Sequence, residues 1–290
     1  MMEAGPTVNS VNATSVMRQL LDWMSINTPE YFKDMGTPDR LKAVKKDYMS
    51  GRIRRLNRIN QRRAIFMDRD GVINKDVRFL HKINDFELLP NVTRAIKKLN
   101  NSEFLAIVVT NQPVIARNLC SIEELEEIHK KMETSLGKEG AKLDGIYYCP
   151  HHPDKGFPEE NPKYKINCNC RKPKTGLVKK AQKDFNIDLK SSYFVGDSFR
   201  DFLCGKKTGM TAIGVKTGRG WKGEGEGKPD YIFSDLDRAV NFILGPVARI
   251  REEKRKLMEE DKKYPFVSII IPTRNVEKII GRCLESLKGL

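Results

Sequence analysis

The sequence contains no long, uninterrupted apolar segment. No run of about eighteen apolar side chains, the length that a membrane-spanning helix needs, occurs in its 290 residues. The N-terminal stretch MMEAGPTVNSVNATS also lacks the basic segment followed by an apolar segment that marks a secretory signal. Apolar residues make up 39% and charged residues 31% of the chain, which is ordinary for a globular protein. These features predict a soluble protein without a membrane span, and we expect it in the cytoplasm.

The excess of basic residues lies mostly outside the middle of the chain. The formal net charge is +15, and counting by segment gives −3 for residues 1–39, +9 for 40–63, +5 for 64–245 and +4 for 246–290. The basic stretch 40–63 is predicted to form a solvated helix and linker, with a role at a phosphate polymer or a membrane surface as the alternative. Because the middle segment is only mildly basic, nucleic acid is not an expected partner.

Short β-rich runs alternate with amphipathic helices from Ala64 onward. This alternation predicts an α/β fold built on a doubly wound parallel sheet. Strands are predicted at residues 64–68, 104–110, 145–149, 192–197, 211–215 and 230–233. Helices are predicted over 89–99, from Ser121 with Glu124 completing a capping box, and over 176–185 and 199–207.

Two carboxylates follow the first predicted strand. Asp68 and Asp70 lie in the segment MDRDGVIN, and their i, i+2 spacing in extended chain turns both side chains to the same side. One carboxylate can attack phosphorus while the other transfers the proton. Gly71 permits the sharp change in chain direction that close approach of a phosphate requires. We therefore interpret Asp68 as a nucleophile and Asp70 as a general acid and base.

Two further residues supply what a phosphate ester needs. Thr110 ends the second predicted strand, in IVVTNQ, where its hydroxyl group could hold a phosphoryl oxygen. Lys172, in RKPKTG before a helix, supplies a fixed positive charge to the same group. Both are predicted to be catalytic.

A magnesium site is predicted from the same segments. Asp197, in FVGDSFRD, ends the fourth main strand and would bind Mg²⁺ with Asp68 and the backbone carbonyl of Asp70. Asp201 follows one helical turn later, where we expect it to orient the site without binding the metal.

The four motifs, in this order, resemble those of haloacid-dehalogenase (HAD) phosphatases. The segments DRDGVIN, TNQPVIAR, CPHHP and CNCRKP narrow the resemblance to subfamily IIIA, which contains the D-glycero-D-manno-heptose 1,7-bisphosphate 7-phosphatases and the histidinol-phosphatases; it covers about 180 residues. The resemblance implies a HAD-like Rossmannoid fold and magnesium-dependent hydrolysis of a small sugar phosphate through an aspartyl-phosphate. The family usually has Ser-Gly where this chain has Pro113 and Val114, which puts the flexibility of that loop in question.

A second metal site is predicted in a cysteine-rich loop. Six cysteines are present, and without a secretory signal they are not expected to form disulfides, because cytosolic thiols stay reduced. A C-x-H segment followed by C-x-C makes a closed set typical of structural zinc, and the resembled family binds zinc there; free thiols are the alternative. The zinc would fix the loop that precedes Arg171 and Lys172. The predicted ligands are Cys149, His151, Cys168 and Cys170; His152 is predicted to be a bystander, and we assign no role to His81 or His129.

The spacing of the motifs leaves no room for a large cap domain. Only about forty residues separate Asp70 from Thr110, and about sixty separate Thr110 from Lys172. The site should therefore be open, with Asn111, Arg117 and Arg171 as candidate substrate-binding residues. The favoured substrate is the heptose bisphosphate; histidinol phosphate, a polynucleotide 3′-phosphate and a non-catalytic scaffold role in glycan assembly are the alternatives.

The flanking segments resemble parts of other enzymes. Residues 31–44 resemble the end of a sugar nucleotidyltransferase, and residues 267–290 resemble the start of a family 2, GT-A glycosyltransferase. We interpret 1–63 as an N-terminal helical segment and basic linker, 64–245 as the phosphatase domain, 246–265 as a charged helical linker and 266–290 as a truncated glycosyltransferase-like start. Such neighbours would place the enzyme in the synthesis of precursors for a surface glycan such as lipopolysaccharide. We expect it to be a monomer or part of a fusion protein. The alternative is that both flanking segments are tails that pack on the phosphatase.

Overall fold

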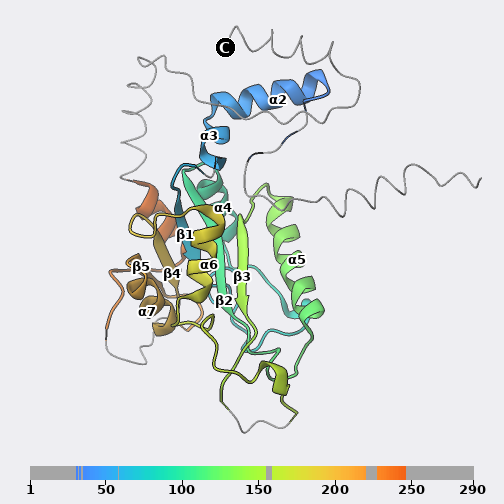
Figure 1. The fold of residues 1–290 in the computed structure, drawn as a ribbon, viewed down its shortest axis with the longest axis vertical. Coiled ribbons are helices and arrows are strands. Elements are labelled where there is room, and N and C mark those ends of the chain that lie inside the picture. The colour runs from blue at the N-terminus through green and yellow to red at the C-terminus, as the bar shows by residue number, and fades with distance from the viewer. Residues whose placement is uncertain are drawn as a thin grey trace, which may run out of the picture.

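The computed structural model describes residues 31, 33, 35–57, 59–154, 159–219 and 227–245 (Figure 1). The predicted linker at 246–265, the glycosyltransferase-like segment at 266–290 and residues 1–30 lie outside these residues. Among the described residues, no helix combines the length and the apolar character that crossing a bilayer would require.

Within the described part of the chain, six parallel strands form one sheet in the order β3-β2-β1-β4-β5-β6. The strands are β1 (Arg63–Met67), β2 (Phe104–Asn111), β3 (Gly145–Cys149), β4 (Tyr193–Gly196), β5 (Thr211–Val215) and β6 (Tyr231–Phe233). Each predicted strand is present, with ends that differ by one residue at most, and the doubly wound α/β fold is confirmed. Asp68 lies just past the last residue of β1 rather than inside it.

The helices lie between the strands as the periodicity predicts. They are α4 (Val92–Asn100), α5 (Ile122–Lys138), α6 (Gly176–Phe185) and α7 (Phe199–Lys207), and residues 236–245 are also helical. The predicted capping box is present at Ser121 and Glu124. The prediction that the first of these helices begins at Leu89 is wrong, because the Leu89 N–H donates to the carbonyl of Ile73 at 2.9 Å and Leu88 pairs with Asn74. The loop after β1 thus holds this segment extended.

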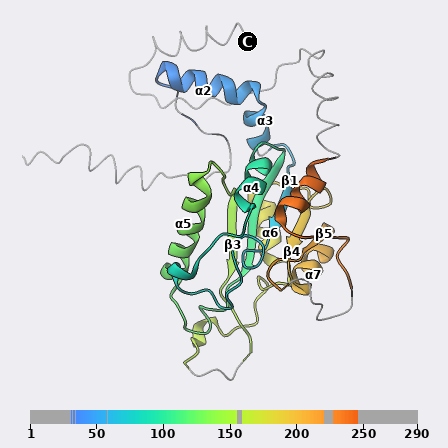
Figure 2. The same ribbon diagram turned by 180° about the vertical axis from the view of Figure 1, so that it is seen from behind.

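Two layers of helices cover the sheet (Figures 1 and 2). Buried side chains of α4, α5 and residues 236–243 pack on one face against Ile65 and Met67, and those of α6 and α7 pack on the other against Ala64 and Phe66. These four β1 residues are completely buried, as expected for a central parallel strand covered on both sides. Burying a side chain as large as that of Ile65, Phe66 or Met67 stabilises the fold by about 1.5 to 3 kcal/mol.

The basic N-terminal segment forms helices beyond the amino ends of the strands (Figures 1 and 2). They are α2 (Pro38–Met49), which buries none of its residues, and the short α3 (Arg52–Leu56). The Asp47 carboxylate accepts a hydrogen bond from the Tyr31 hydroxyl at 2.9 Å and pairs with Lys33 and Arg52. This segment therefore has local contacts of its own at the end of the sheet away from the carboxyl ends of the strands.

Candidate active site

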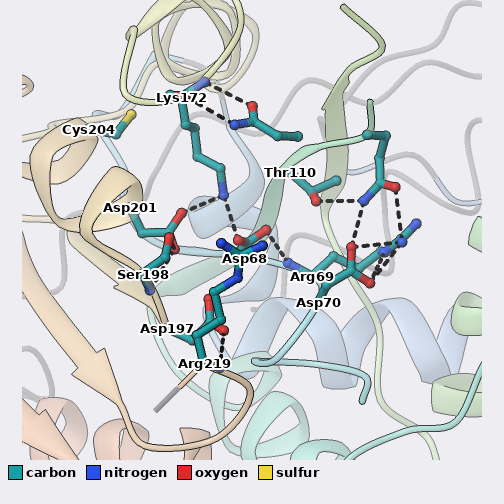
Figure 3. A network of polar contacts seen from close by, with 12 residues as sticks. Asp68, Arg69, Asp70, Thr110, Lys172, Asp197, Ser198, Asp201, Cys204 and Arg219 are labelled. Carbon is teal, nitrogen blue, oxygen red and sulfur yellow. Dashed lines mark hydrogen bonds and ion pairs between the residues drawn. The ribbon is translucent and has the colours of Figure 1, made fainter. Parts of the chain in front are cut away.

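The predicted catalytic residues meet where the chain changes direction across the sheet. β1 and β4 are neighbours, but the chain leaves β1 toward β2 and leaves β4 toward β5, so a crevice opens outside their carboxyl ends. Asp68 follows β1, Asp197 follows β4 and Thr110 lies in β2. Lys172 comes from the loop before α6 and Asp201 from α7. Figure 3 shows these five side chains around one space.

Lys172 is a buried cation held between carboxylates. Its Nζ atom lies 2.9 Å from Asp68 Oδ2 and 2.6 Å from Asp201 Oδ1, and only 2% of the residue is exposed. Burial alone would lower the pKa of Lys172, but the charges of Asp201 and Asp68 outweigh it and raise the pKa. The Asn111 side chain fixes the Lys172 backbone, accepting from its N–H at 2.9 Å and donating to its carbonyl at 3.1 Å. Asn111 thus positions the lysine, and its predicted contact with substrate stays a prediction.

Three carboxylates share the space beside this lysine. Asp68, Asp197 and Asp201 each offer an oxygen within 4.8 Å of the others. Burial is the largest cause that raises the pKa of Asp68 to about 7 and that of Asp197 to about 8, and the neighbouring carboxylates add to both. One lysine cannot neutralise three clustered acids. A divalent cation would supply the missing positive charge, and an all-oxygen set suits Mg²⁺.

Asp201 has both carboxylate oxygens engaged by protein groups. Oδ1 faces Lys172, and Oδ2 accepts hydrogen bonds from the N–H of Ser198 at 3.2 Å and from its hydroxyl at 2.6 Å. Asp201 thereby ties the start of α7 to the lysine. The orienting role predicted for Asp201 stays a prediction. Its carboxylate also lies close enough to those of Asp68 and Asp197 to belong to the carboxylate cluster.

Two glycines allow the backbone to close around Asp197. Gly71 and Gly218 both have positive φ, +80° and +65°, and a Cβ atom at either position would overlap the Asp197 carboxylate. The same carboxylate accepts a hydrogen bond from the N–H of Arg219 at 2.8 Å. This close approach of the backbone to Asp197 therefore requires glycine at both positions. It holds the Asp197 side chain in place at the crevice.

Asp70 faces a different set of partners from Asp68. Its carboxylate accepts hydrogen bonds from Arg69 Nη2 at 2.8 and 2.9 Å, from Asn74 Nδ2 at 2.9 Å and from Gln112 Nε2 at 2.8 Å. Gln112 Nε2 also lies 2.9 Å from Thr110 Oγ1. Burial alone would raise the pKa of Asp70, but the charge of Arg69 and these hydrogen bonds lower it overall. Asp70 is therefore a carboxylate in the resting protein.

Sequence reasoning did not identify Arg69, Gln112 or His129 as members of this network. Arg69 is completely buried, and its Nη1 atom lies 3.3 Å from His129 Nε2 on α5. Arg69 and Gln112 sit beside predicted motif residues, so their position in sequence was an available signal. A single histidine on a helix gives no such signal, because only the fold brings it to Arg69.

The four predicted zinc ligands come together at the end of β3. The sulfur atoms of Cys149, Cys168 and Cys170 lie 3.1 to 3.5 Å apart, and His151 Nδ1 is 3.2 Å from Cys170 Sγ. Burial raises the pKa of the Cys149 thiol, which disfavours its thiolate in the absence of a cation. A tetrahedral metal would sit among four such ligands. His152 lies outside this set of possible ligands, as predicted.

The two predicted substrate-binding arginines lie on different loops. Arg171 Nη1 donates to the carbonyl of His151 at 3.1 Å, which links it to the cysteine cluster. The Arg117 guanidinium lies 4.0 Å from the centre of the Phe79 ring. Val114, where the family usually has glycine, is completely buried and packs with Ile115, so this position is anchored. Contact of either arginine with substrate stays a prediction.

Known proteins resemble this chain over most of their length. A family model described as HAD-hydrolase-like matches residues 169–239. The D-glycero-beta-D-manno-heptose-1,7-bisphosphate 7-phosphatase of Haemophilus ducreyi is 40% identical over 184 residues, covering 63% of this chain and 98% of that protein. The Escherichia coli protein of that name is 38% identical over 174 residues, covering 60% and 89%. The crystal structure of the D,D-heptose 1,7-bisphosphate phosphatase from B. bronchiseptica with magnesium and phosphate has a TM-score of 0.57 and 31% identity, covering 63% and 99%.

Proposed function

The chain belongs to the D-glycero-beta-D-manno-heptose-1,7-bisphosphate 7-phosphatase family of HAD phosphatases, and on that premise we propose that it hydrolyses the 7-phosphate of this bisphosphate to release the 1-phosphate and inorganic phosphate. The observation that carries the proposal is the similarity over 98% of a relative of that name. The convergence of Asp68, Lys172 and Asp197 at one crevice supports it.

In the proposed reaction Asp68 is the nucleophile. Its oxygen attacks phosphorus, and the bond between phosphorus and the sugar oxygen breaks as the aspartyl-phosphate forms. The departing oxygen keeps the electron pair and takes a proton from Asp70. Water then loses a proton to Asp70 and attacks phosphorus, so that phosphate leaves and the Asp68 carboxylate is restored. Lys172 and Thr110 hold the phosphoryl oxygens during both steps.

Asp70 has to gain its proton before the first step. Its lowered pKa keeps the resting side chain ionised, which suits the base of the second step. A phosphate bound close by adds negative charge, and a neighbouring negative charge raises the pKa of a carboxyl group. We therefore propose that Asp70 takes up its proton as substrate binds.

The residues around Asp68 fit a magnesium ion. We propose that the Asp68 and Asp197 carboxylates and the Asp70 backbone carbonyl would hold it, since burial and then the neighbouring carboxylates raise the pKa values of the two acids, and a bound cation would offset both effects. When bound, Mg²⁺ would screen the repulsion between the carboxylate and the phosphate. A structural zinc is likewise proposed at the cluster of Cys149, His151, Cys168 and Cys170.

We also propose that residues 64–245 act as the phosphatase domain in the cytoplasm, where the thiols of the zinc cluster would stay reduced. Arg117 and Arg171 are proposed to receive the second phosphate at the open mouth of the site. The product would then be a precursor of a nucleotide-activated heptose used to build a surface glycan.

A substrate panel tests the proposed function. Phosphate release is measured from heptose 1,7-bisphosphate, histidinol phosphate and a 3′-phosphorylated oligonucleotide, each with and without Mg²⁺. We expect turnover of the bisphosphate only with Mg²⁺, and a kcat/KM at least about tenfold above the other two substrates, because a second phosphate adds charge-assisted contacts. Preference for either alternative substrate would replace the proposal, and no turnover of any would favour the scaffold role.

Magnesium affinity is expected to rise with pH between 6 and 8. The folded-state pKa values of Asp68 and Asp197, about 7 and about 8, lie above the value of 3.8 for a free aspartate. Without metal, these two acids therefore lower stability as pH rises from about 4 to about 8. The ion must displace their protons, so its affinity should fall by about tenfold or more per pH unit below 7.

Isothermal titration calorimetry in two buffers of different ionisation enthalpy measures both this affinity and the protons released. The gain in melting temperature from Mg²⁺ should be larger at pH 8 than at pH 6. An affinity that does not change over this range would contradict the assignment of Asp68 and Asp197 as the ligands.

A further inference from the structure

We propose that His129 is a positioning residue for the reaction, acting through the buried guanidinium of Arg69 on the proton-transferring carboxylate of Asp70. The inference rests on the proposed phosphatase function and extends it to a helix that carries none of the HAD motifs. His129 lies on α5 and contacts Arg69 Nη1, whereas Asp70 contacts Arg69 Nε and Nη2.

Arg69 holds Asp70 with a planar fork of donors. Its Nη2 atom lies 2.8 and 2.9 Å from the two Asp70 oxygens, and its Nε atom lies 3.2 Å from Oδ1 (Figure 3). Because a guanidinium is rigid and planar, fixing its remaining nitrogen fixes the plane of the fork. Besides its own hydrogen bonds from Asn74 and Gln112, the orientation of Asp70 thus depends on what holds Nη1.

That remaining nitrogen faces His129. Nη1 lies 3.3 Å from His129 Nε2, and only 6% of the histidine is exposed. Arginine has donors and no acceptor, so Nε2 must be the unprotonated ring nitrogen and the proton must sit on Nδ1. Burial, followed by the charge of Arg69, lowers the pKa of His129 to about 3, which keeps the ring neutral. The ring also lies 5.4 Å from that of Tyr148, which limits its rotation.

Gln112 closes the network on the other side. Its Oε1 accepts from Arg69 Nη2 at 3.1 Å, while its Nε2 reaches both Asp70 and Thr110. Arg69 is therefore supported by Gln112, the residue after β2, and by His129 on α5. Charged or titratable groups beside the network include Asp68 beside Asp70, Tyr148 beside His129, and Cys120 beside Arg69.

A misplaced Asp70 would affect substrates according to their leaving groups. A sugar alkoxide must be protonated as it departs, whereas a 4-nitrophenolate leaves readily without a proton. Loss of the His129 acceptor should therefore lower kcat/KM, which reports formation of the aspartyl-phosphate, much more for the sugar phosphate than for 4-nitrophenyl phosphate. General damage to the fold would slow both reactions by the same factor.

The test compares His129→Phe, which removes the acceptor, with His129→Gln, whose amide oxygen restores one. For His129→Phe we expect kcat/KM on the sugar phosphate to fall by about 10- to 100-fold and kcat/KM on 4-nitrophenyl phosphate to stay within about threefold. The ratio kcat/KM is compared because it reports the steps up to formation of the aspartyl-phosphate and not the later hydrolysis, in which Asp70 is the base for both substrates. His129→Gln should recover most of the lost rate. His129→Ala gives the same comparison if the phenylalanine does not fold.

Met132→Ala is the matched control, because Met132 is buried one turn further along α5 and belongs to the core cluster rather than to the Arg69 network. Its effect should be equal on the two substrates. Equal losses on both substrates for His129→Phe, or no recovery in His129→Gln, would overturn the positioning role while leaving the phosphatase function intact. Wild-type protein inactive on both substrates would instead refute the proposed function, and this inference with it.

Discussion

Replacing Asp68 with asparagine is expected to abolish phosphate release, lowering kcat by on the order of 10⁴-fold or more. The amide has nearly the same shape as the carboxylate but is too weak a nucleophile to attack phosphorus. The substitution would also remove a negative charge beside Lys172, whose Nζ atom lies 2.9 Å from Asp68 Oδ2. Steady-state phosphate release measures the loss, and acid quenching of the wild-type protein with labelled substrate should trap phosphate on Asp68.

The expected inactivity of Asp68→Asn would not come from unfolding. Burial raises the pKa of Asp68 to about 7, so at pH 8 without Mg²⁺ the carboxylate destabilises the fold and its removal should leave the melting temperature unchanged or higher. Asp85→Asn, on an exposed 3₁₀ helix, is the surface control and should keep full activity. Activity of Asp68→Asn above about 1% of wild type would place the nucleophile elsewhere.

The sheet was predictable because its strands carry their own signal. A central parallel strand is buried on both faces, so β1 and β2 are nearly continuous apolar runs. The start of α4 was not predictable in the same way. Leu89 has helical spacing with the residues that follow it, but it and Leu88 pair with the loop after β1, which keeps them extended. A local sequence pattern predicts a helix or strand correctly only where no distant segment forms hydrogen bonds with the same backbone groups.

The same distinction separates the parts of the site. Asp68, Asp197, Lys172 and the cysteine cluster could be placed from sequence because each residue type has few uses at the end of a strand or in a closed metal set. The residues that hold these groups in place could not be predicted in this way. The Asn111 side chain accepts a hydrogen bond from the Lys172 N–H, 61 residues further along the chain, and Arg69 contacts His129, 60 residues further along. Contacts of that kind depend on how the sheet and helices pack, which no local motif records.

Removing one of the proposed zinc ligands is expected to lower both the stability and the catalytic rate. Cys168 is the best position, because it is only partly buried and a serine there fits without strain. A structural zinc is worth about 10 kcal/mol or more in small metal-binding domains. Losing one ligand should therefore lower the melting temperature of Cys168→Ser by about 10 °C, and kcat/KM by about 10- to 100-fold. Atomic absorption should find less than one zinc per chain.

The catalytic loss follows from how the cluster is connected to the crevice. Cys170 precedes Arg171 and Lys172 directly, the Asn169 carbonyl accepts from the N–H of Gly176 at 2.9 Å, and Lys174 Nζ lies 2.8 Å from the Cys168 carbonyl. Releasing the loop would thus free the backbone that aims Lys172 at Asp68. Cys120→Ser is the matched control for zinc content, a buried thiol outside the cluster, and should keep its zinc. Full activity in a zinc-free Cys168→Ser protein would show that the lysine is held without the metal.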